Sequence, residues 1–225
     1  MKELMKMFRA MPLGLVVSLT VLTLPSLTFA ENLSGTALVQ ALRQGGYVLV
    51  MRHASSPHDV PDKTTVNPDN VKSERQLDQT GRDTAMAMGA AMKKIGIPVG
   101  DVLSSPTYRA LETVKLADFG TAKTYEELGD GGASMSAQAV TGWASWLKMR
   151  VSKKPHTGTN SILVTHSPNI AAAFPGEAKG LSDGETLVFL PRSMDAVLVA
   201  RVKIEDWVRL AQDALPIQRS GNGNK

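Results

Sequence analysis

Apolar and polar positions follow two different patterns along this chain, one typical of helices and one typical of buried strands. Between residues 34 and 44 apolar side chains recur every three to four positions until two glycines end the pattern, which predicts a helix. Residues 47–51 form a continuous, valine-rich apolar run, as in a strand buried on both faces of a parallel sheet. Similar patterns predict further helices over 80–95, 107–119, 136–151, 169–173 and 205–214, and further strands over 101–104, 161–165, 186–190 and 196–203.

The order of these elements predicts the fold class. Because strands and helices alternate, we expect an α/β fold with a layered sheet, and ligands on such sheets bind beyond the carboxyl ends of the strands. Residues 54–72 contain several prolines, aspartates and asparagines and no apolar period, so they are expected to form a loop over the end of the first strand. A second, glycine-rich loop is expected near 129–132.

The first thirty residues predict the compartment. Three basic residues precede an apolar run over 11–24, and small residues at Thr28 and Ala30 suggest cleavage after Ala30, as in a secretory signal peptide. The run is shorter than the roughly twenty apolar residues that span a bilayer. We therefore expect a periplasmic or secreted protein without stable membrane insertion after cleavage, and an uncleaved anchor remains the alternative.

Composition limits what the rest of the chain can be. Residues 31–217 are long enough for one well-buried domain, and 218–225 are expected to form a disordered tail. The chain has no cysteine, so packing rather than disulfides must stabilise it. Without residues 1–30, which carry three basic residues and one acidic residue, 22 basic and 20 acidic residues remain, and no basic block is interleaved with aromatics. We expect no nucleic-acid partner, and the oligomeric state stays open.

Polar side chains that could take part in catalysis or binding follow three of the predicted strands. Arg52 and His53 end the first strand, Arg109 lies in the first turn of the helix after the second, and His166 follows a later strand. Serine precedes proline in the last two segments, at 105–106 and 167–168, a pairing expected at an N-cap and a first helical position. Free N–H groups at such helix termini favour a bound phosphate.

Arginine and histidine together suit phosphoryl transfer. Two guanidinium groups can hold the non-bridging oxygens of a phosphate, and an unprotonated imidazole can attack phosphorus and carry the phosphoryl group. Nearby guanidinium charges lower the pKa of a histidine and keep it nucleophilic. This chemistry needs no metal and no other cofactor.

These residues resemble the histidine phosphatases of the phosphoglycerate-mutase-like superfamily, over roughly residues 47–190. The similar segments are Arg-His-Ala at 52–54, an Arg-x-Leu-x-x-x-Gly turn within 73–81, the segment 104–113 and Val-Thr-His at 164–166. The resemblance implies a single-domain, three-layer α/β/α sandwich with a mostly parallel central sheet.

The resemblance also implies site roles. It makes His53 the phosphohistidine, and it makes Arg52, Arg109 and His166 the residues that bind and stabilise the transferring phosphate. The substrate would be a small phosphorylated molecule, and an exported enzyme of this family suggests a sugar phosphate of the cell envelope.

The general acid is less well defined. Asp130 fits the family position best by its offset from a preceding leucine, and Glu127 is the nearest glutamate. Glu185 could also reach the pocket, but a structural role near the site explains it better. Ser56 resembles a polar phosphate contact of the mutase branch, but Asp59 replaces that branch's asparagine, which weakens a mutase interpretation.

Two other classes of function remain open. A catalytically inactive phosphate-binding module would bind phosphate or vanadate with negligible hydrolysis, because its acid is misplaced. A metal-binding protein that uses His53 and His166 is poorly supported, because no carboxylate or thiolate with ligand spacing accompanies them.

Overall fold

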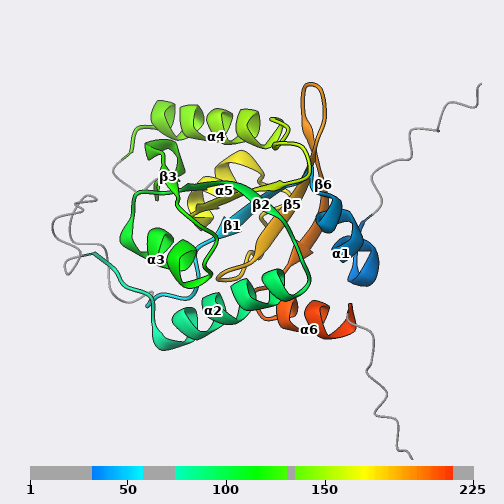
Figure 1. The fold of residues 1–225 in the computed structure, drawn as a ribbon. Helices are drawn as coiled ribbons and strands as arrows, with labels where there is room; N and C mark the ends of the chain where they lie inside the picture. Colours follow the sequence, from blue (N-terminus) through cyan, green and yellow to red (C-terminus); the bar gives the residue numbers. More distant parts are fainter. Residues whose placement is uncertain (1–31, 58–73, 131–134, 215–225) are drawn as a thin grey trace, which may run out of the picture.

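A single six-stranded sheet organises the protein (Figure 1). The computed structural model describes residues 32–57, 74–130 and 135–214, so the predicted signal segment, most of the predicted 54–72 loop and the predicted tail lie outside the described residues. The strands are β1 Val48–Arg52, β2 Val99–Ser104, β3 Lys123–Thr124, β4 Asn160–Thr165, β5 Thr186–Pro191 and β6 Ala196–Val202. The helices are α1 Gly35–Gln44, α2 Gln79–Lys94, α3 Tyr108–Leu116, α4 Ala137–Val151, α5 Ser167–Ala173 and α6 Asp206–Asp213, with a short 3-10 helix, η2, at Glu126–Leu128.

The strand order in the sheet is β3-β2-β4-β1-β5-β6. The first four strands in this order run parallel, β5 runs antiparallel to β1, and β6 runs antiparallel to β5. The expected α/β class with a mostly parallel sheet is therefore confirmed. Since Arg52 of β1 pairs with Thr165 of β4, the residues that follow these two strands emerge side by side at one edge of the sheet.

Two apolar cores lie on opposite faces of the sheet, between it and the helices that form the outer layers of a three-layer sandwich. In β1, Leu49 and Met51 face the core that is covered by α1, α2, α3 and α6, whereas Val48 and Val50 face the core that is covered by α4 and α5. This alternation explains the continuous apolar run, because a strand covered on both faces needs apolar side chains at every position.

Most of the predicted elements are confirmed, with differences at their ends. The helix expected to reach residue 119 ends at Leu116, because Asp118 adopts a left-handed backbone with φ 51°. Neither β3 nor η2 was predicted, since two and three residues are too short for a periodic pattern. Within the described part of the chain, no helix combines the length and the apolar character needed to cross a bilayer.

The packing of α2 against the turn after α3 gives a test of the fold. A Cβ added at Gly89 of α2 would lie 2.0 Å from the carbonyl oxygen of Ala117. We expect Gly89→Ala to lower the free energy of unfolding by about 1–3 kcal/mol, because backbone has to move to admit the methyl group. Urea unfolding followed by circular dichroism measures the change.

Gly142 of α4 is the matched control, since a Cβ added there meets no atom within 4 Å. We expect Gly142→Ala to raise the free energy of unfolding by about 0.5–1 kcal/mol, the ordinary gain of alanine over glycine in a helix. Equal effects of the two substitutions would contradict the close approach of α2 to residue 117.

Candidate active site

His53 lies directly beyond β1 and is held by its backbone on both sides. Its N–H donates to the Thr165 carbonyl at 3.0 Å, and its own carbonyl accepts from Gly184 N at 3.0 Å. The buried ring places Nδ1 2.7 Å from the carbonyl oxygen of Ala54. A carbonyl can only accept, so Nδ1 carries the proton and the lone pair lies on Nε2.

His166 lies beyond β4, beside His53. The two ring centroids are 5.1 Å apart with an interplanar angle of 63°. His166 Nδ1 lies 3.2 Å from the Arg109 guanidinium, which can only donate, so this nitrogen accepts. His166 Nε2 then carries the proton and donates to Ser105 Oγ at 3.0 Å, with Thr107 Oγ1 at 3.2 Å.

Arg109 joins the two histidines. It is the second residue of α3 and is fully buried. Its Nε donates to His53 Nε2 at 3.3 Å, and its NH2 group lies 2.6 Å from Asp130 Oδ2. A buried guanidinium needs an ionic partner, and Asp130 supplies it.

Arg52, the last residue of β1, is held by the loop before β5. Its NH1 donates to the Leu181 carbonyl at 3.2 Å, and its NH2 forms an ion pair with Asp183 Oδ1 at 2.6 Å. Its Nε is buried and has no hydrogen-bond partner among the described residues. This nitrogen is therefore a donor that a bound oxyanion could satisfy.

Glu185 fixes that loop instead of contacting the histidines. Its carboxylate accepts from Ser182 N at 2.9 Å and from Arg201 Nε of β6 at 2.7 Å. Burial raises the pKa of Glu185, but these hydrogen bonds outweigh it and leave the pKa below its usual value. Arg201 NH1 also donates to the carbonyls of Glu177 and Lys179, so one β6 side chain closes the loop.

Asp130 comes from a second tethered loop. Thr165 Oγ1 donates to the Leu128 carbonyl at 2.7 Å, and Asn169 Nδ2 donates to the carbonyls of Glu127 at 2.6 Å and Gly129 at 3.3 Å. The Asp130 carboxylate consequently lies against Arg109, with Oδ1 3.7 Å from His166 Nδ1. Its side chain is 38% exposed, so it lies at the mouth of the site.

The other two candidates from the sequence, Glu127 and Ser56, have surroundings unlike those of Asp130. The Glu127 carboxylate has no hydrogen bond or ion pair to the described residues, and only its backbone is held by Asn169. Ser56 is buried, and its Oγ donates to the Gln76 carbonyl at 2.8 Å, which joins the segment after β1 to the segment before α2.

The predicted N-caps are wrong in detail. Thr107 and not Ser105 caps α3, and His166 and not Ser167 caps α5. The physical reason is that the Ser105 hydroxyl is engaged with the His166 ring and with Thr107 N. Arg109 still falls in the first turn of its helix, as expected.

Four residues near the site have roles that were not predicted. Asp183 pairs with Arg52, and Asn169 tethers the Asp130 loop. Arg75, known from the sequence only as part of a turn motif, contributes positive charge at both histidines. Its neighbour Glu74 accepts from Tyr108 N at 2.6 Å and so binds this segment to the start of α3. Only the polar composition of these loops hinted at such roles.

Burial is the main reason why both histidines stay neutral. It lowers the pKa of His53 to about 3; the hydrogen bond to Ala54 opposes this shift, and nearby arginine charges add to it. Burial also lowers the pKa of His166 well below its usual value, assisted by His53 and Arg109. The site thus offers an unprotonated imidazole beside guanidinium groups at neutral pH.

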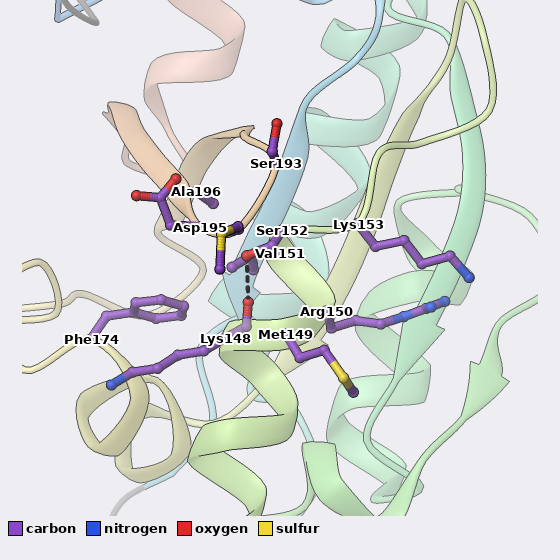
Figure 2. A pocket seen from close by; sticks show the side chains of 11 residues that line it. Lys148, Met149, Arg150, Val151, Ser152, Lys153, Phe174, Ser193, Asp195 and Ala196 are labelled. Carbon is purple, nitrogen blue, oxygen red and sulfur yellow. Dashed lines mark hydrogen bonds between the residues drawn. The ribbon is translucent and has the colours of Figure 1, made fainter.

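Within the described ranges, no group of three or more histidine, cysteine, aspartate or glutamate residues is arranged to hold a metal ion. A cavity of about 760 Å³ lies between the end of α4 and the β5–β6 turn (Figure 2). Since Val48 pairs with Phe189, this turn lies beyond the amino end of β1, opposite His53.

Comparisons with known proteins identify the fold. No protein-family model and no curated protein matches the chain. The solved structure of the protein histidine phosphatase SixA complexed with tungstate matches with a TM-score of 0.50 at 19% identity, over 71% of this chain and 98% of that one. A mutant phosphoserine phosphatase from Entamoeba histolytica, in complex with phosphoserine, matches with a TM-score of 0.51 at 15% identity, over 71% and 98%. The chain therefore has the fold of the histidine phosphatase superfamily.

The neutral histidines give a prediction for stability. In the unfolded chain His53 has its ordinary pKa of 6.5, and folding lowers it to about 3. Protonation therefore favours the unfolded state. The stability that the folded protein has with His53 neutral is complete above pH 6.5 and is lost as the pH falls towards 3. We expect His53→Asn, which keeps a donor near Nδ1, to lessen the fall in unfolding free energy between pH 6 and pH 4 by about 1.4 kcal/mol per pH unit.

Urea unfolding at several pH values checks this expectation. His156 is exposed and pairs only with Asp101, at 3.7 Å, among the described residues, so His156→Asn controls for the loss of a histidine outside the buried site. An identical slope in the parent and in His53→Asn would show that His53 is not buried as a neutral ring.

Proposed function

We propose that the protein is a metal-independent phosphatase that hydrolyses phosphate monoesters through a phosphohistidine on His53 Nε2. The observation that carries this proposal is the hydrogen bond from His53 Nδ1 to Ala54, which directs the lone pair of Nε2 towards Arg109 and His166. An imidazole fixed in this tautomer needs no further deprotonation before it attacks.

The first step transfers the phosphoryl group. Nε2 attacks phosphorus, the P–N bond forms and the ester P–O bond breaks, and the leaving oxygen takes a proton from the candidate acid Asp130, whose carboxylate gains that proton from the bound ester monoanion once the phosphate replaces it at Arg109. Arg109 would exchange its 3.3 Å contact with Nε2 for a phosphate oxygen, a small loss because that hydrogen bond is already long. Arg52, through its buried Nε, binds another oxygen.

The second step returns the enzyme to its starting state. Water attacks phosphorus, its proton passes to the Asp130 carboxylate and from there to the departing phosphate, and the P–N bond breaks to release phosphate and restore the neutral His53. Guanidinium groups fixed before the reaction stabilise the charge that spreads over the equatorial oxygens in both steps. His166, beside His53, completes the walls around the transferring group.

The matched structures and the sequence support the substrate class. SixA was solved with tungstate, and the phosphoserine phosphatase with phosphoserine, so both bind small oxyanionic or phosphorylated ligands. The basic head and apolar run of residues 1–30 support export, and with it an envelope sugar phosphate as substrate.

The first test uses two substrates that differ in leaving group. With chelator present, the purified protein should hydrolyse p-nitrophenyl phosphate, and His53→Ala should lower kcat/KM by about a thousandfold or more. For a phosphomonoester of an aliphatic alcohol, Asp130→Asn should cost roughly 10²–10⁴-fold, because the alkoxide needs a proton. The nitrophenolate leaves without being protonated, so Asp130→Asn should lower kcat/KM for p-nitrophenyl phosphate much less.

Glu127→Gln is the matched control for Asp130→Asn, since its carboxylate has no contact with the site. Equal losses with both substrates would remove Asp130 as the acid. No turnover in the parent, with vanadate still bound, would favour the phosphate-binding module and refute the phosphatase. Activity abolished by chelator would refute metal independence.

Export has its own test. The protein recovered from the periplasm or the culture medium should begin at Glu31, and mass spectrometry of the intact chain checks this. Full-length chain in the membrane fraction would instead indicate an uncleaved anchor.

A further inference from the structure

The site has a buried end and an exposed end with different charges. His53, Arg109 and His166 are each at most 2% exposed, so the phosphoryl group of a substrate must enter towards them. The side chains of Asp130 and Asp183 are 38% and 24% exposed. The organic part of a bound phosphate ester must therefore extend out of the site past these two carboxylates.

The charges around the histidines are nearly balanced. The guanidinium groups that act on His53 are those of Arg109, Arg52 and Arg75. Asp130 and Asp183 offset two of these positive charges through ion pairs of 2.6 Å each. A phosphate dianion adds two negative charges beside these carboxylates.

We infer that the site selects phosphomonoesters of uncharged or amine-bearing alcohols and rejects esters that carry a carboxylate or a second phosphate next to the phosphoryl group. This inference rests on the proposed function. Asp183 is the specificity-determining residue, because its carboxylate lies at the mouth beside Arg52. A neighbouring anion would meet like charge there, whereas an ammonium group would meet a partner.

Two pairs of substrates isolate the effect. Glycerol 3-phosphate and 3-phosphoglycerate differ by a hydroxymethyl group in place of a carboxylate, and phosphoethanolamine differs from phosphoserine by the absence of a carboxylate. We expect kcat/KM to be about tenfold or more higher for the first member of each pair. Equal values within both pairs would overturn the inference.

Asp183→Asn tests the residue itself. The substitution should lower the preference ratio within each pair by about tenfold, whatever its effect on the absolute rate through Arg52. Asp213→Asn removes the same charge from an exposed position on α6 and should leave the ratio unchanged. An unchanged ratio in Asp183→Asn would overturn the role of Asp183.

The two proposals fail in distinguishable ways. If p-nitrophenyl phosphate and all four natural esters remain intact, the phosphatase proposal fails. If they are hydrolysed but the carboxylated esters react as fast as their neutral partners, only the selectivity fails.

Discussion

The guanidinium of Arg109 is the group on which the rest of the site depends. It is fully buried, and an unpaired charge in such a position costs several kcal/mol. Asp130 supplies the ionic partner through NH2, and Nε and NH2 also donate to the rings of His53 and His166. Both rings must then present lone pairs to Arg109, so each carries its proton on the other nitrogen. The Ala54 carbonyl and the Ser105 hydroxyl accept hydrogen bonds from those N–H groups, and in this way one buried cation fixes the tautomers of two histidines.

Sheet topology determines where this arrangement can form. The central parallel strands β1, β2 and β4 end at one edge, and the pairing of Arg52 with Thr165 puts the next residues, His53 and His166, at the same level. The backbone hydrogen bond from His53 N to the Thr165 carbonyl continues this pairing one residue beyond the strand. The proposed nucleophile His53 is thus placed by the rigid sheet, whereas the carboxylates come from loops.

This division explains how far the sequence could predict the site. Arg52, His53, Arg109 and His166 were predicted to converge because each follows a strand that its apolar run makes visible. Asp130 was a candidate by its offset alone, and nothing local distinguished it from Glu127. The contacts that separate them come from Thr165 and Asn169, roughly forty residues away along the chain. Such long-range hydrogen bonds leave no periodic pattern, and the same is true of the bond between Arg201 and Glu185.

Both loop tethers act on aspartates that pair with an arginine of the site. Asn169 and Thr165 hold the loop of Asp130, which meets Arg109, and Arg201 with Glu185 holds the loop of Asp183, which meets Arg52. A phosphate that binds must share or displace these carboxylates, which weakens its binding. The same pairs keep both guanidinium groups oriented, so little reorganisation remains when charge develops during the reaction. In the proposed phosphatase mechanism, weaker ground-state binding with pre-oriented cations favours stabilisation of the transition state over tight retention of phosphate, as a hydrolase that must release phosphate requires.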